Sequence, residues 1–67
     1  MKNLKLTAIS KAVETRRYEG MNYGVYAYAQ FIGETNRLDS AIQMAEDNWD
    51  LSELRIVEYS TSTAYEF

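Results

Sequence analysis

The side chains that most often perform catalysis or hold a metal are missing from this sequence. Its 67 residues include no histidine and no cysteine. This excludes disulfide frameworks, zinc fingers and nucleophiles that depend on an imidazole base. The three glycines lack the spacing of a phosphate-binding loop. Paired carboxylates can do acid–base chemistry, but nothing in the sequence places two of them in a cleft. We expect a protein that is not an enzyme and uses no cofactor.

Acidic side chains are densest in a run between residues 46 and 53. It falls at the end of a predicted helix, where negative charge opposes the helix dipole. We predict that it contacts a basic surface on a protein partner, and a solvated face is the alternative. A metal site is disfavoured because the Asp-rich calcium loop with its central glycine is absent, so no metal is expected. The four carboxylates are Glu46, Asp47, Asp50 and Glu53.

Tyrosine is unusually frequent, with six in the chain. Tyr26 and Tyr28 share one face of a predicted strand, and Tyr59 on a later strand is assigned to the same face. Tyrosine brings a large contact area and a hydroxyl group that tolerates water, which suits binding interfaces. We therefore predict that these three residues contact a partner. Ordinary cross-strand pairing is the alternative.

Basic residues gather at the other end of the chain. Residues 1–17 carry five basic and one acidic side chain, whereas residues 18–67 carry two basic and nine acidic ones. Arg16 and Arg17 beside a predicted turn are candidates for holding a partner, unless they are simply solvated. Lysines on an edge strand prevent edge-to-edge aggregation, which is the favoured role of Lys2, Lys5 and Lys11.

The first predicted element is a long strand over residues 3–15. Apolar alternation runs to Ala8 and resumes at Ile9 on the opposite parity, which indicates a bulge or bend. A helix over residues 8–15 is the alternative. Turn chemistry follows at residues 19–22.

A second strand is predicted over residues 23–31, because aromatic and β-branched residues alternate there. Its core face would carry Tyr23, Val25, Ala27, Ala29 and Phe31.

A helix is predicted after Gly33, which ends this strand. Thr35 or Asn36 would cap it and Asp39 would lie in its first turn. Its apolar stripe, at three- and four-residue spacing, comprises Leu38, Ala41, Ile42, Ala45 and Trp49.

A third strand is predicted over residues 54–59, and residues 61–67 either continue it around a bend or form a short fourth strand. The fold class is α+β, with two layers. An antiparallel sheet of three to four strands carries one helix on one face, in the order β-β-α-β(β). One helix covers only one face of a sheet, so the tyrosine face would be left for solvent or a partner.

The sequence length suits a single small α+β domain over residues 1–67. The longest uninterrupted apolar run, residues 25–29, is far shorter than a membrane span or signal-peptide core. We expect a cytoplasmic protein with no membrane association.

The favoured function is that of a small acidic protein-binding inhibitor. In size, charge and composition the chain resembles phage proteins that act against host nucleic-acid machinery, including anti-CRISPR proteins and DNA-mimicking inhibitors. This resemblance implies a protein partner such as a Cas complex, blocked by occupation of its surface. The net charge of −3 is small for a DNA mimic, which favours steric blocking.

Other interpretations stay open. Residues 33–41, with Ala45, resemble the strand-to-helix junction of HicB-type antitoxins, which implies an antitoxin-like or regulatory module; the Pro-Gly turn of that family is absent here. Weak nucleic-acid binding through the basic first strand, with Tyr26 and Tyr28 stacking on bases, is opposed by the acidic remainder of the chain. A homodimer is a further alternative.

Overall fold

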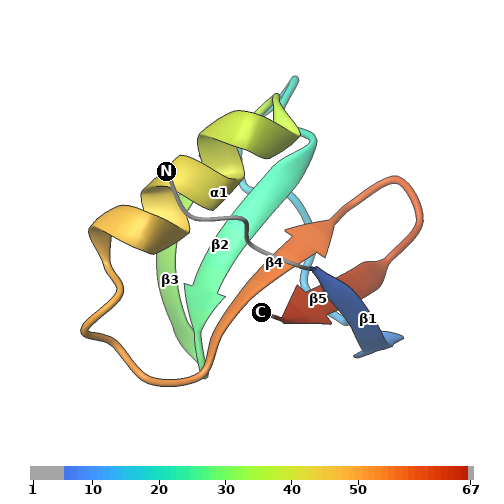
Figure 1. Ribbon diagram of the computed structural model, residues 1–67. Helices are drawn as coiled ribbons and strands as arrows, with labels where there is room; N and C mark the ends of the chain where they lie inside the picture. The colour runs from blue at the N-terminus through green and yellow to red at the C-terminus, as the bar shows by residue number, and fades with distance from the viewer. Residues whose placement is uncertain (1–5, 67) are drawn as a thin grey trace.

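A five-stranded antiparallel sheet with one helix packed against it makes up the part of the chain that the computed structural model describes, residues 6–66 (Figure 1). The sheet order β1-β5-β4-β2-β3 places β1 and β3 at the edges. The predicted α+β class is confirmed. The elements are β1 (Thr7–Lys11), β2 (Tyr23–Ala27), β3 (Gln30–Thr35), α1 (Leu38–Asp47), β4 (Leu54–Glu58) and β5 (Thr63–Glu66).

The predicted second strand, residues 23–31, is in fact a hairpin of β2 and β3. Ala27 pairs with Gln30, so Tyr28 and Ala29 form a two-residue turn. Tyr28 has a φ of 56°. Positive φ at the first turn position is typical of a type II′ turn, which normally carries glycine there. The order is therefore β-β-β-α-β-β, and the prediction of three to four strands is wrong.

The predicted irregularity in the first strand is confirmed. The register of β1 against β5 shifts between Ala8 and Ser10, so Ile9 is the extra residue of a β-bulge. The strand ends at Lys11 instead of residue 15. Lys11 lies on an edge strand as expected, whereas Lys2 and Lys5 lie outside the described residues.

The C-terminal strands follow the prediction closely. β4 begins at Leu54, and residues 63–66 form a separate short strand, which was one of the two alternatives. β5 pairs with both β4 and β1. It therefore joins the first strand to the rest of the sheet.

Helix α1 packs on β2, β3 and β4 through small side chains (Figure 1). Ala41 and Ala45 are fully buried and form a core cluster with apolar residues of β2 and β4. Gly33 faces the helix, where a Cβ would lie 2.6 Å from Sδ at the flexible end of Met44. The helix is too short and too polar to span a bilayer, and the described residues contain no other helix.

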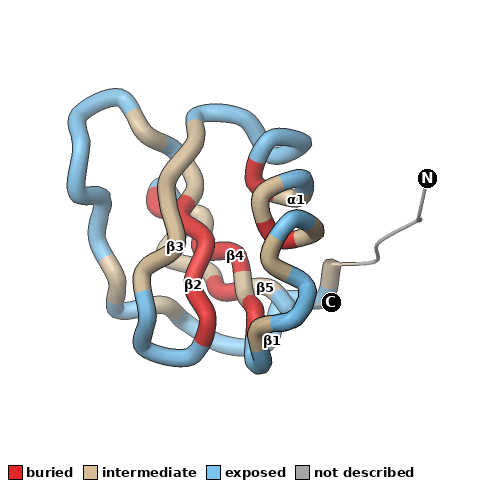
Figure 2. Tube along the Cα trace, turned by 90° about the vertical axis from the view of Figure 1, so that its left-hand side faces the viewer, coloured by how far each residue is buried: buried red, intermediate tan, exposed pale blue. Residues whose placement is uncertain are grey.

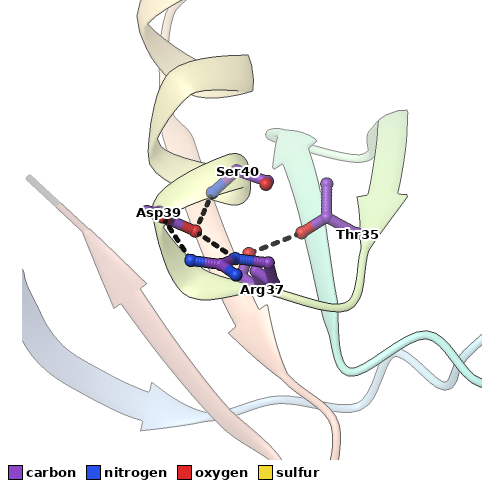
Figure 3. A network of polar contacts seen from close by, with 4 residues as sticks. All are labelled: Thr35, Arg37, Asp39 and Ser40. Carbon is purple, nitrogen blue, oxygen red and sulfur yellow. Dashed lines mark hydrogen bonds and ion pairs between the residues drawn. The ribbon is translucent and has the colours of Figure 1, made fainter.

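The helix begins differently from the prediction. Arg37 is the N-cap residue, and no side chain makes a capping hydrogen bond. Thr35 still belongs to β3, and its Oγ1 donates to the Arg37 carbonyl oxygen over 2.8 Å (Figure 3). Asp39 lies in the first turn as predicted, where it accepts a hydrogen bond from the Ser40 amide and pairs with Arg37 over 3.0 Å.

The sheet face opposite α1 is also covered. Tyr26, Val57 and Tyr59 form a second buried cluster there. Residues 12–22, which we name the strap, lie across this face without helix or strand structure (Figure 2). Ala12 and Met21 of the strap pack against the cluster. The expectation of an uncovered second face is therefore wrong, because an irregular segment covers what a helix does not.

Candidate partner-binding groove

An open groove of about 880 Å³ lies between the first part of the chain and the β2–β3 turn. Residues 9–17, from the β1 bulge and the strap, form one part of its lining. Tyr28, Ala29 and residues 53–55 form another. We name this feature the strap groove.

The structure divides the predicted contact residues among three places. Tyr59 lies in the second buried cluster. Glu46, Asp47 and Asp50 lie at or beyond the end of α1 and do not line the groove. The remaining five predicted residues all line the strap groove, and they are Arg16, Arg17, Tyr26, Tyr28 and Glu53.

Three of the six exposed large apolar side chains in the described residues line the strap groove. The exposed fractions are 90% for Val13, 70% for Tyr28 and 45% for Ile9. Grouped apolar exposure is a common mark of a binding surface. Val13 and Ile9 were not among the predicted contact residues, because both were assigned to the long first strand. The parity change near Ala8 was the available signal that the chain departs from a regular strand there.

Arg55 connects the two sides of the groove. Its Nη2 lies 2.5 Å from Glu14 Oε2 and donates to the Tyr28 carbonyl oxygen over 2.7 Å. Its guanidinium lies 5.2 Å from the centre of the Tyr26 ring. The hydrogen bond from Arg55 holds the pKa of Glu14 below its usual range. Sequence reasoning gave Arg55 no role, since its partner Glu14 is distant in the chain.

The other charges of the groove have both signs. Lys11 and Arg16 make no ion pair within the described residues, and neither do Glu53 and Glu66. Arg17 is differently placed, because its guanidinium stacks over the Phe31 ring at 4.1 Å. The groove therefore offers apolar contact together with charges that form no ion pair within the described residues.

Glu34 of β3 fixes the strap to the sheet. Its carboxylate accepts hydrogen bonds from the Arg17 amide over 2.7 Å and the Tyr18 amide over 3.1 Å. It also accepts one from the Tyr59 hydroxyl group over 2.6 Å. Desolvation alone would raise the pKa of Glu34, but these hydrogen bonds outweigh it and hold the pKa below its usual range.

Tyr26 and Tyr59 are structural in this arrangement. Their exposed fractions are 3% and 9%, so the expectation that both are available to a partner is wrong. The hydroxyl oxygens are 3.1 Å apart, and since Tyr59 donates to Glu34, Tyr26 donates to Tyr59. Burial, together with the bond to Glu34, raises the pKa of Tyr59. Only Tyr28 of the three predicted tyrosines is exposed.

The acidic run stays outside the groove except for Glu53. Asp47 accepts a hydrogen bond from Gln43 over 3.0 Å, and no carboxylate of the run forms an ion pair within the described residues. Trp49, in the middle of the run, is 49% exposed. No group of acidic side chains in residues 6–66 is arranged to hold a metal ion.

Comparison of the chain with protein-family models, curated proteins and solved structures finds no match. The strap groove is therefore the feature from which a function can be inferred.

Proposed function

We propose that this protein is a small cytoplasmic inhibitor that binds another protein through the strap groove. The observation that carries the proposal is the exposure of Ile9, Val13 and Tyr28 around one open groove. Burying apolar surface stabilises a complex by about 25 cal/mol per Å² before the losses of association are counted. A partner that covers these three side chains would gain from their desolvation.

The acidic run at residues 46–53 supports a partner with a basic, nucleic-acid-handling surface, of the kind blocked by anti-CRISPR proteins. Glu53 belongs both to the groove lining and to the acidic run. A partner seated in the groove would therefore contact at least one carboxylate of the acidic run, that of Glu53. Such charges mainly increase the association rate and the specificity. Inhibition would come from occupation of the partner's surface.

Tyr28→Gly is the sharpest test of this surface. The substitution removes the exposed ring, and glycine suits the φ of 56° at this position. We expect the variant to fold at least as stably as the wild type but to lose capture of the partner from a host lysate. Val13→Ser is expected to have the same effect, because Val13 is 90% exposed and contributes little to the core.

Leu38→Ser is the matched control, since Leu38 is 39% exposed and does not line the strap groove. A captured protein that persists with Tyr28→Gly and Val13→Ser, or that is lost equally with Leu38→Ser, would contradict the proposed surface. For inhibition, the captured partner is expected to lose its nucleic-acid binding when the wild-type protein is added.

Nucleic-acid binding is a second candidate, favoured because Lys11 and Arg16 line the same groove as the exposed Tyr28. Binding of this kind weakens steeply as salt concentration rises. A mobility shift with single-stranded DNA or RNA at low salt that disappears with Arg16→Glu would support it. Absence of any shift at low salt would remove it.

A further inference from the structure

We propose that the strap opens as a unit, separately from the sheet and helix. The contacts of Glu34 and Glu14 hold it closed, and we name these contacts the latch. Opening would dismantle the strap groove and uncover Tyr26 and Tyr59. The latch is a property of the free protein, whereas its effect on partner binding rests on the proposed function.

The strap has little apolar attachment between its ends. Ala12 and Met21 pack against the second cluster, but Val13 and Tyr18 between them are 90% and 65% exposed. Segments with few buried apolar contacts open at lower free energy than the core does. The middle of the strap is therefore the part of this face most easily detached.

Backbone hydrogen bonds anchor the two ends of the strap. The Ala12 amide donates to the Ser62 carbonyl oxygen over 2.7 Å. At the other end, the Asn22 amide donates to the Thr35 carbonyl oxygen, and the Tyr59 amide donates to the Asn22 carbonyl oxygen, both over 3.0 Å. These anchors are the natural hinges for movement of the residues between them.

Two carboxylates, one from each side, hold the middle of the strap. Glu34 of the sheet binds the amides of Arg17 and Tyr18, and Glu14 of the strap binds Arg55 of β4. Hydrogen bonds to charged groups are stronger than neutral ones. The Arg17 guanidinium adds a stacking contact over Phe31. Release of these few contacts frees the strap without breaking a strand pair.

The sheet side of the latch stays in place when the strap leaves. Tyr59 donates to Glu34 and accepts from Tyr26, and all three residues belong to the sheet or its adjoining turn. Gly24 leaves room for these hydrogen-bonded side chains, because a Cβ there would lie 2.2 Å from the Tyr59 hydroxyl oxygen. The Glu34 carboxylate is thus held in position to accept hydrogen bonds from the strap amides again when the strap closes.

The same movement controls the groove, because residues 12–17 of the strap are part of its lining. A partner that contacts Val13 and Tyr28 together can bind only while the strap is closed. Binding would consequently stabilise the closed state, as a ligand does for any conformation that it prefers.

Hydrogen exchange on the free wild-type protein tests the latch. We expect the amides of Arg17 and Tyr18 to exchange through a local opening with little dependence on denaturant. The amides of Val25 and Ile56, which lie in the sheet core, are expected to exchange through global unfolding with strong dependence. Equal denaturant dependence for both pairs would overturn the proposal.

Two variants test whether the carboxylates of Glu34 and Glu14 hold the strap closed. Glu34→Ala and Glu14→Ala are each expected to accelerate exchange at Arg17 and Tyr18 by on the order of tenfold more than at the core amides. Asp39→Ala, which removes an exposed ion pair beside the helix start, is the control and should leave the strap amides unchanged. Equal acceleration of strap and core amides by both latch variants would show that the strap is no separate unit. Because no partner is needed, these results can fail or succeed independently of the capture experiment.

Discussion

Gly24 and Gly33 both lie in the β2–β3 hairpin, but they face different side chains. Gly24 faces the Tyr26 and Tyr59 rings, whereas Gly33 faces the flexible end of Met44. Neither has a positive φ, so space and not backbone conformation explains both glycines. The difference lies in whether the neighbouring side chain can move away.

We predict that Gly24→Ala lowers the free energy of unfolding by about 1–3 kcal/mol, as overpacking does. The new Cβ would push the Tyr59 hydroxyl group away from Glu34. Gly33→Ala is the matched comparison and should change stability by under about 1 kcal/mol, because Met44 can adjust and alanine loses less backbone entropy than glycine. Urea unfolding measures both. Equal losses for the two variants would contradict this account of the tyrosine pair.

At the scale of elements, the strap depends on ionised carboxylates, which makes it sensitive to acid. The pKa values of Glu34 and Glu14 both lie below their usual range in the folded protein. Each therefore stabilises the closed strap fully above the usual glutamate pKa, and this stabilisation is lost as pH falls through the lowered value.

We predict that the amide chemical shifts of Arg17 and Tyr18 move in a titration whose midpoint lies below the ordinary glutamate pKa of about 4.3. The shifts should report the loss of the Glu34 bonds as the strap opens. Glu34→Gln provides the control, since it removes the titrating group while keeping an acceptor oxygen. A midpoint at or above the ordinary value would be inconsistent with the hydrogen bonds described.

The sequence predicted the elements with strong local signals and missed those defined by distant contacts. The bulge at Ile9, helix α1 and strand β4 follow from local periodicity, and all three are observed. The β2–β3 turn was missed because alternation reads the same whether a chain continues or reverses, and Tyr28 gives no turn signal. The strap was missed because its hold depends on Glu34, far along the chain.

The contrast between local signals and distant contacts also explains which parts of the candidate site could be predicted. The types of residue at Arg16, Arg17 and Tyr28 favoured binding, and all three line one groove. Whether a tyrosine on the second face is exposed depends on the strap. For that reason Tyr26 and Tyr59 could not be distinguished from Tyr28 in the sequence.

For the molecule as a whole, two apolar clusters share one sheet. Neighbouring residues of β4 serve opposite faces, with Ile56 in the helix-side cluster and Val57 in the strap-side cluster, and both are fully buried. The small helix-side core is thus supplemented by a second one. A chain of this length has little other apolar surface to bury.

We predict that Val57→Ala lowers the free energy of unfolding by about 2 kcal/mol, from the loss of buried carbon atoms and the cavity left behind. Val13→Ala removes the same atoms from a side chain that is 90% exposed, and should change stability by less than about 0.5 kcal/mol. Urea unfolding followed by the fluorescence of Trp49 provides the measurement. A small effect of Val57→Ala would show that the strap-side cluster contributes little to the stability of the fold.

The pairing of β1 with β5 has a consequence for the order in which the molecule is assembled. Among the described strands β1 pairs with β5 alone, more than fifty residues later in the chain. Pairings of such long sequence separation carry a high loop-closure entropy and tend to form late. Ile9, Lys11 and Ala64 of this strand pair line the strap groove. The strap groove is thus completed only when these two strands have met. The buried residues of the helix-side cluster reach no further along the chain than Ile56, so that cluster can form before the groove is complete.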